Sequence, residues 1–297
     1  MQHTSGLTIS SAGSSPDEEP EPNPGAQDQD MLRRLQARYV EKKKKSDSDQ
    51  GTGVANDLWA EMARLSALGK LEPGDRVLDV GCSLGAWTNL LDRAGYESHG
   101  LDFSPGLVEE ARRRSEASGS GAIFTLGPAE AIPYPDGHFD AVICNYMLEH
   151  AADWESVVKE IGRVVRPGGV VYLGTVCAIY PFTDEVRLPL YPYYPRFVKR
   201  FAIRLALTRF PVLVGYSPTP AVNWLKPGDL KRAFTEAGLV DIHDAFDVVE
   251  PDHLKGVKRQ MARVLLPVLR RVRFLKSLAY LGYPGLKFYA VRAQEDR

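Results

Sequence analysis

Short apolar segments alternate with amphipathic segments between residues 76 and 176, and this alternation constrains the fold more than any other feature. Strands separated by helices form a parallel sheet that has helices on both faces. We therefore expect an α/β fold with a doubly wound, mostly parallel sheet, whose ligands bind at the carboxyl ends of the strands. The predicted strands are 76–82, 98–103, 122–126, 140–146 and 170–176, and the predicted helices are 86–94, 105–118 and 155–165.

The segments outside this alternation differ in composition. Residues 1–30 are rich in Pro and acids and contain no Lys or Arg, so they are predicted to be a disordered acidic tail. Residues 31–297 are predicted to be one domain that carries a helical cap insertion at about 179–227. A second insertion at about 253–282 is predicted to be two basic amphipathic helices, the second starting at Pro267. The remaining elements are a helix at 228–238 and strands at 239–249 and 286–293.

Charge is distributed unevenly, although the formal net charge of the chain is -1. Residues 177–297 hold 20 Lys and Arg against 11 Asp and Glu, and residues 253–293 hold ten basic residues and no acid. This asymmetry predicts an anionic partner, either a membrane surface or an acidic substrate. The basic helices either dock on an anionic membrane or pack on the domain with their charges in water.

The cysteines and the hydropathy indicate the compartment. Cys82, Cys144 and Cys177 are far apart and lack metal-ligand spacing, which favours buried thiols in a reducing environment. No apolar run reaches transmembrane length, and no secretory signal is recognisable. We expect a cytoplasmic protein, with peripheral membrane attachment as the open alternative.

A glycine-rich turn follows the first strand, in the segment Val77-Leu78-Asp79-Val80-Gly81-Cys82-Ser83-Leu84-Gly85. Gly81 and Gly85 allow the backbone to pass close to a ligand, and Asp79 can accept a hydrogen bond from an ammonium group. A second carboxylate, Asp102, ends the next strand 17 residues after Gly85. An acid at that position can bind both hydroxyls of a ribose. The alternatives are an ordinary strand-turn-helix connection and, for Asp102, a cap of the helix at Pro105.

Four segments in this order resemble the class I S-adenosyl-L-methionine-dependent methyltransferases, especially the small-molecule branch similar to methyltransferase type 11. They are VLDVGCSLG, GLDFS, PAEAIPYPDGHFDAVICNYMLEH and RVVRPGGVVYLGT. The resemblance implies a Rossmann-like fold and S-adenosyl-L-methionine as the cofactor. It also implies the contacts: Asp79, Gly81 and Gly85 at the methionine end, with Cys82 and Ser83 in the same cofactor-binding turn, Asp102 at the ribose, Phe103 and Ala129 at the adenine, and Asn145 near the sulfonium.

The chain departs from the family pattern at two positions. Ser83 occupies the place of the middle glycine of the turn, where it must adopt the backbone angles of a glycine. Pro128 occupies the place of an acid that often receives the adenine amino group. Glu130 either substitutes for that acid or lies on the surface.

His150 follows the cofactor strand on the expected substrate side and is the candidate general base, because the ordinary pKa of histidine is near neutrality. The alternative is a histidine held by hydrogen bonds at a helix start. Ubiquinone-pathway O-methyltransferases have a similar Glu-His pair that joins a metal site with a further Glu. That further position matches Tyr146 here, so no metal is expected.

The sequence thus predicts methyl transfer to a small lipophilic or anionic acceptor, with oxygen favoured. The predicted cap contains the aromatic residues Tyr180, Tyr191, Tyr193, Tyr194, Phe197, Phe201 and Trp224. These cap aromatics either line an acceptor pocket or form the core of the cap. A nicotinamide-dependent oxidoreductase and a non-catalytic membrane-binding or partner-binding module are the alternatives. Nucleic acid is not expected as a partner, because the fourth strand ends in Cys144-Asn145-Tyr146-Met147 and not in an Asn/Asp-Pro-Pro-aromatic motif. The sequence leaves the oligomeric state open.

Overall fold

The computed structural model describes residues 41, 51–180, 191–209, 221–251, 256–283 and 285–294. The predicted acidic tail lies outside these residues. The strands are β1 (Arg76–Val80), β2 (Glu97–Asp102), β3 (Ile123–Leu126), β4 (Phe139–Asn145), β5 (Val165–Val176), β6 (Leu239–Asp244) and β7 (Gly285–Arg292). The α-helices are α2 (Gly51–Gly69), α3 (Ala86–Arg93), α4 (Pro105–Ser118), α5 (Trp154–Val164), α6 (Arg196–Arg209), α7 (Pro227–Glu236), α8 (Ala245–Val248), α9 (Gly256–Arg271) and α10 (Arg273–Ala279). The 3-10 helices are η1 (Leu148–His150), η2 (Tyr191–Tyr193) and η5 (Tyr280–Gly282).

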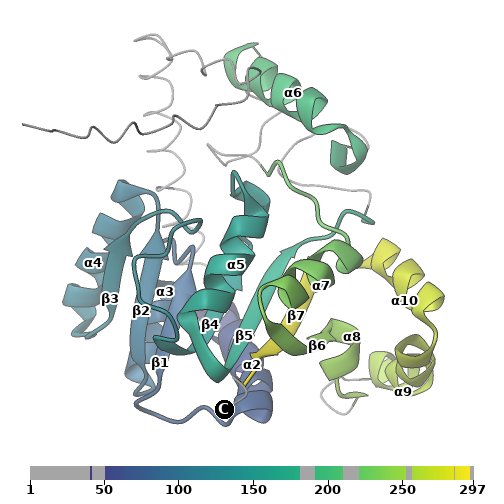
Figure 1. Cartoon of the computed structure of the whole chain (residues 1–297), viewed down its shortest axis with the longest axis horizontal. Helices are drawn as coiled ribbons and strands as arrows, with labels where there is room; N and C mark the ends of the chain where they lie inside the picture. The colour runs from purple at the N-terminus through teal and green to yellow at the C-terminus, as the bar shows by residue number, and fades with distance from the viewer. Residues whose placement is uncertain are drawn as a thin grey trace, which may run out of the picture.

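In this part of the chain, seven strands form one sheet in the order β3-β2-β1-β4-β5-β7-β6 (Figure 1). The five strands from β3 to β5 pair in parallel, whereas β7 is antiparallel to both β5 and β6. The strand order reverses between β1 and β4, which is the switch point where such sheets bind ligands. The predicted Rossmann-like, doubly wound and mostly parallel sheet is therefore confirmed.

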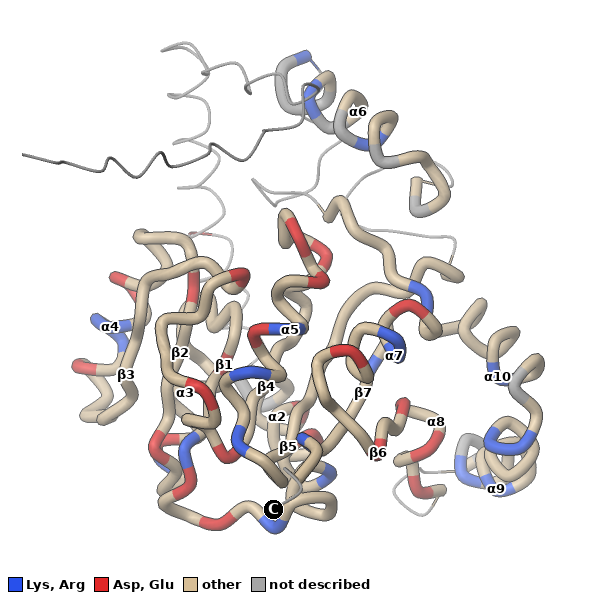
Figure 2. The backbone as a smooth tube through the Cα atoms, viewed as in Figure 1, with Lys and Arg blue, Asp and Glu red and all other residues tan. Residues whose placement is uncertain are grey.

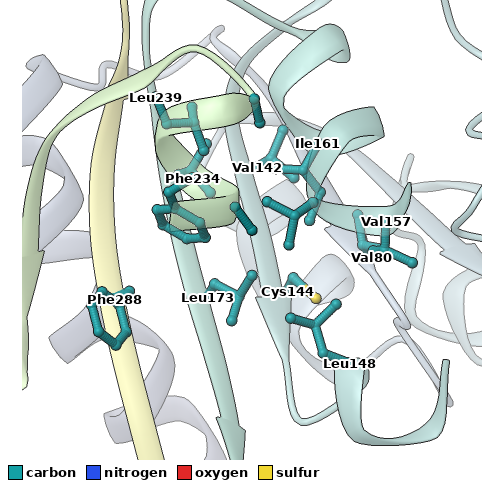
Figure 3. Packing of buried hydrophobic residues seen from close by; sticks show 14 of the residues in the cluster. Val80, Val142, Cys144, Leu148, Val157, Ile161, Leu173, Phe234, Leu239 and Phe288 are labelled. Atoms are coloured by element: carbon teal, nitrogen blue, oxygen red, sulfur yellow. The ribbon is translucent and has the colours of Figure 1, made fainter. Parts of the chain in front are cut away.

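Helices cover both faces of the sheet because the strands are apolar on both sides. One face packs against α5 and α7, and the other against α2, α3 and α4. Figure 3 shows the first of these layers, where side chains of α5 and α7 lie over β4, β5 and β7. The labelled residues are Val80, Val142, Cys144, Leu148, Val157, Ile161, Leu173, Phe234, Leu239 and Phe288.

Three predicted boundaries are wrong. The strand at 239–249 ends at Asp244, because Asp244 and Asp247 form a capping box that starts the helix α8. The strand at 170–176 begins earlier, at Val165, since the Pro-Gly-Gly segment is absorbed as an irregularity in the pairing with β4. Pro267 lies inside α9 and does not start the next helix, which begins at Arg273.

The described parts of the predicted cap at 179–227 are η2, α6 and an extended segment that returns to the domain. Tyr191 and Trp224 pack edge to face at a centroid distance of 5.2 Å and form a small cluster with Tyr194 and Val222. The buried Lys199 of α6 lies over the Trp224 ring at 4.4 Å. Several cap aromatics therefore form the core of the cap, whereas Tyr193, Phe197 and Phe201 are exposed.

The helices α9 and α10 attach to the β6–α8 end of the sheet through their basic residues. The Arg270 guanidinium donates to the carbonyls of Phe246 and Val249 at 3.0 and 2.8 Å. Lys276 forms ion pairs with Asp244 and Asp247, each at 2.7 Å. Figure 2 shows further basic residues on α9, away from the acids of α8. Two basic residues, Arg270 and Lys276, thus hold α9 and α10 to the domain.

Candidate cofactor and acceptor site

The turn after β1 has the geometry of a ligand cradle. Gly81 and Gly85 have φ angles of 79° and 73°, in the left-handed region that favours glycine. A Cβ atom at Gly81 would lie 2.6 Å from Met147 Cγ, and one at Gly85 would lie 2.6 Å from the Phe124 ring. Both positions therefore require glycine for its conformation and for its lack of a side chain. Ser83, the predicted departure, adopts a φ of 52°.

Asp79, the penultimate residue of β1, lies two residues before Gly81 of this turn and is buried. Its Oδ2 atom accepts a hydrogen bond from Thr88 Oγ1 at 2.8 Å. Burial raises the pKa of Asp79 from its ordinary value of 3.8 to about 7, and the nearby charge of Asp102 adds to this effect. A cation that binds beside Asp79 would favour its ionised form and lower this pKa.

Asp102 at the end of β2 faces the same turn. Its Oδ2 accepts from the Ser83 amide at 3.0 Å, and its Oδ1 accepts from the Ser104 amide at 2.9 Å. Ser104, and not Asp102, is the N-cap residue of α4. The carboxylate therefore fixes the turn against β2, and this arrangement is compatible with hydrogen bonds from a ribose. Phe103, next in the chain, is 60% exposed, as a ring that receives an adenine must be.

Cys82 contributes its backbone to the turn. Its amide donates to the Leu101 carbonyl at 3.0 Å, and its side chain packs beneath the turn in a cluster with Val108 and Phe124. Burial raises the pKa of the Cys82 thiol well above its ordinary value, so the thiol stays neutral.

Of the remaining residues predicted to contact the cofactor, Ala129 and Glu130 lie on the loop between β3 and β4, and Asn145 lies at the end of β4. Ala129 packs on the main core. The Glu130 carboxylate accepts from the Ala152 and Asp153 amides at 3.1 and 3.5 Å, so it joins its loop to the start of α5. Asn145 ends β4, and its Oδ1 accepts from the Tyr172 hydroxyl at 3.0 Å. That bond fixes the orientation of the Asn145 side chain at the carboxyl end of β4.

His150 lies in η1, and a segment far away in sequence holds this short helix. The Asn223 side-chain amide donates to the carbonyls of Leu148 and Ala151 at 3.0 and 2.8 Å. The buried Glu149 carboxylate accepts from Thr175 Oγ1 at 2.9 Å. Among the described residues, no group of three or more His, Cys, Asp or Glu side chains has the arrangement of a metal site.

The structure thus brings the predicted turn residues, Asp102 and Asn145 to neighbouring strand ends. Sequence reasoning missed the side chains that orient them. Thr88 lies nine residues after Asp79, near the start of α3. A polar residue at the start of the helix that follows β1 was the sequence signal for this contact. Nothing in the sequence near Tyr172 or Asn223 indicates their contacts, because each partner comes from a distant segment.

Comparisons with known proteins show which sequences this chain resembles. A family model described as "Methyltransferase domain" matches residues 78–173. The chain is 32% identical to the demethylmenaquinone methyltransferase of Symbiobacterium thermophilum over 180 residues, which are 57% of this chain and 70% of that protein. It is 29% identical to the ubiquinone biosynthesis O-methyltransferase of Methylocella silvestris over 181 residues, 60% of this chain and 63% of that protein.

A shorter sequence match and a similarity in fold were also found. The malonyl-[acyl-carrier protein] O-methyltransferase of Serratia marcescens is 32% identical over 115 residues, 39% of this chain, and the match spans 44% of that protein. The fold is similar to a putative methyltransferase solved in complex with the Haloferax volcanii Trm112 methyltransferase activator. That similarity has a TM-score of 0.51, 20% identity, and coverage of 88% of this chain and 98% of the other.

Proposed function

Since this chain belongs to the class I S-adenosyl-L-methionine-dependent methyltransferase family, we propose that it methylates a small lipophilic or anionic acceptor at oxygen. Its cofactor is S-adenosyl-L-methionine. The observation that carries the assignment of this site is the pair of buried carboxylates, Asp79 and Asp102, on either side of the turn at the switch point. Two relatives are named as O-methyltransferases, which supports oxygen as the acceptor atom.

Residues at the carboxyl ends of β1, β2 and β4 suit different groups of the cofactor. Asp79 would receive the cationic methionine end, because a cation favours the ionised form of a carboxyl group with a raised pKa. Asp102 would bind the ribose hydroxyls and Phe103 would pack on the adenine. Asn145, oriented by Tyr172, would contact the methionine portion near the sulfonium. The bound cofactor supplies a methyl group on a positively charged sulfur, and the protein supplies alignment.

His150 is the proposed general base. Transfer to a phenol or an alcohol requires removal of the hydroxyl proton, and an imidazole on the acceptor side can take it. Asn223 and the Glu149–Thr175 hydrogen bond hold the η1 segment in place, which supports a fixed position for His150. The family membership argues against the nicotinamide-dependent oxidoreductase and against a non-catalytic module.

We also propose that the acceptor is reached at an anionic membrane surface. The helix α9 exposes the apolar face formed by Met261, Val264, Leu265 and Val268, and the following helix α10 exposes Phe274. Val264 and Phe274 are 70% and 71% exposed. This face is larger than the scattered apolar residues of ordinary surfaces, and the segment carries no acid. No helix among the described residues is long and apolar enough to span a bilayer.

The acceptor proposal is tested by methyl transfer from labelled S-adenosyl-L-methionine to a panel of acceptors. The panel contains a prenylated catechol, a prenylated naphthoquinol, a fatty acid and an alkyl amine. We expect label on the hydroxylated aromatics, and none with the Asp102→Ala variant. Label on the amine alone, or on no member of the panel, contradicts oxygen methylation of a lipophilic acceptor.

The membrane proposal is tested by sedimentation with vesicles of phosphatidylcholine, with and without phosphatidylserine. We expect binding to the anionic vesicles that weakens at high salt. Val264→Glu and Phe274→Glu should each reduce binding at least tenfold. The matched control is Ile123→Glu, which changes an exposed apolar residue on the distant edge strand β3. Equal loss with the control, or no binding at low salt, contradicts the proposal.

A further inference from the structure

Tyr146 borders the candidate site on the side of β5 and β7, yet neither the cofactor contacts nor the proposed base uses it. It follows Asn145 directly at the end of β4, and its amide continues the sheet by donating to the Gly174 carbonyl at 2.8 Å. Its φ angle is 52°, a left-handed conformation that a residue with a bulky side chain adopts at an energetic cost. Strained residues of this kind are concentrated at binding and catalytic sites.

The backbone of Tyr146 directs its ring across the edge of the sheet. A Cβ atom at Gly285 would lie 2.8 Å from the Tyr146 hydroxyl oxygen, so the phenol rests on the first residue of β7. Because β5 separates β4 from β7, the ring spans the carboxyl end of β5. Any other residue at position 285 would place its side chain against this phenol and displace it. The side chain is nevertheless 46% exposed, so one side of the ring is open to a ligand.

The phenol interacts electrostatically with one fixed cation, a second phenol and two carboxylates. Lys287 lies two residues after Gly285 on the same face of β7. Its ammonium group is held by Glu61 Oε1 at 2.8 Å, and Glu61 is itself fixed by Arg64 and Tyr289. Electrostatic interactions connect Lys287 with Tyr146 and with Tyr283. The carboxylates of Glu149 and Asp57 act on the phenol more weakly than Lys287 does.

The protonation of Tyr146 suits a donor. Burial raises the pKa of the phenol, and the opposing effect of Lys287 is smaller. The hydroxyl therefore carries its proton at neutral pH. Within the described residues the hydroxyl has no hydrogen-bond partner, so its proton is available to a ligand on the exposed side of the ring.

We propose that Tyr146 binds the acceptor by donating a hydrogen bond to a phenolic or carboxylate oxygen beside the cofactor's methyl group. The anchored Lys287, which interacts electrostatically with Tyr146, favours an oxygen that carries negative charge. The subsite rests on the proposed function, because it assumes an acceptor with such an oxygen. It adds to that function the residue that selects the acceptor, and it explains why a strained tyrosine occupies this position.

The test is a titration of the full chain, saturated with S-adenosylhomocysteine, with 4-nitrocatechol, whose absorbance reports the ionisation of its hydroxyls. We expect saturable binding with the spectrum of the ionised probe. Tyr146→Phe keeps the ring and removes the donor, so it should weaken binding about tenfold and reduce the spectral shift. In turnover of the same probe, KM should rise more than kcat falls. The affinity for S-adenosylhomocysteine should not change.

Two further variants separate this role from a structural one. Tyr96→Phe is the matched control, since it removes a phenol at the amino end of β2, and it should bind the probe as the unchanged chain does. Tyr146→Gly removes the strain, so it should keep or raise the melting temperature while it loses probe binding. Equal probe binding by Tyr146→Phe and the unchanged chain overturns the subsite and leaves the proposed function intact. Absence of probe binding by the unchanged chain, together with S-adenosylhomocysteine binding, overturns the acceptor class and the subsite with it.

Discussion

Replacing Asp79 by Asn should make the stability of the cofactor-free protein less dependent on pH. Asp79 is buried, its Oδ2 accepts one hydrogen bond from Thr88, and burial raises its pKa from 3.8 to about 7. Because the folded state holds the proton more tightly than the unfolded state, this group favours folding below pH 4. That stabilisation is lost as the pH rises through 7.

The size of the effect follows from the two pKa values. Their difference corresponds to about 4 kcal/mol in the free energy of unfolding, of which roughly 2.5 kcal/mol is lost between pH 5 and pH 8. The Asn side chain keeps the shape and still accepts from Thr88, but it does not ionise. The variant should therefore be more stable than the unchanged chain at pH 8, and the advantage should shrink toward pH 5.

Urea denaturation at pH 5, 6, 7 and 8 measures this difference directly. Glu236→Gln, which alters an exposed carboxylate on α7, serves as the control and should leave the pH dependence unchanged. Calorimetry with S-adenosylhomocysteine adds a second measurement. Binding of its ammonium group should release a proton below pH 7, and Asp79→Asn should abolish that release. The reasoning is refuted if the difference in unfolding free energy between the variant and the unchanged chain is the same at pH 5 and pH 8.

Three further substitutions test the site. Asp102→Ala should weaken S-adenosylhomocysteine binding by about 1–3 kcal/mol through lost charge-assisted hydrogen bonds, and unchanged affinity in calorimetry would remove Asp102 from the site. His150→Ala should lower turnover about a hundredfold with little change in cofactor affinity, whereas a small loss with a flat pH profile would assign His150 to structure. Asn223→Ala leaves the carbonyls of Leu148 and Ala151 without their amide donor and should reduce stability by about 2 kcal/mol. An unchanged melting temperature would show that water replaces those bonds.

The glycine turn and the parallel sheet could be predicted from the sequence because their signals are local. Gly81 and Gly85 are read from a nine-residue segment, and Asp102 from its distance to that segment. The boundary between β6 and α8 was missed although its signal is also local, because polar and apolar residues alternate at the start of 239–249 as they do in a strand. A capping box then stabilised a helix where the pattern suggested a strand.

Other features depend on segments that only the folded chain brings together. The pKa of Asp79 is set by its burial and by Asp102, 23 positions away in sequence, and the η1 segment is held by Asn223, 72 and 75 positions from its two partners. The orientation of α9 is the clearest case. Its periodicity predicts an apolar face but does not say which face packs. In the structure Arg270 and the buried Leu266 contact the domain, and the apolar face around Val264 remains exposed. A helix places its residues by its own geometry, whereas the face that it buries is chosen by the surface available to it.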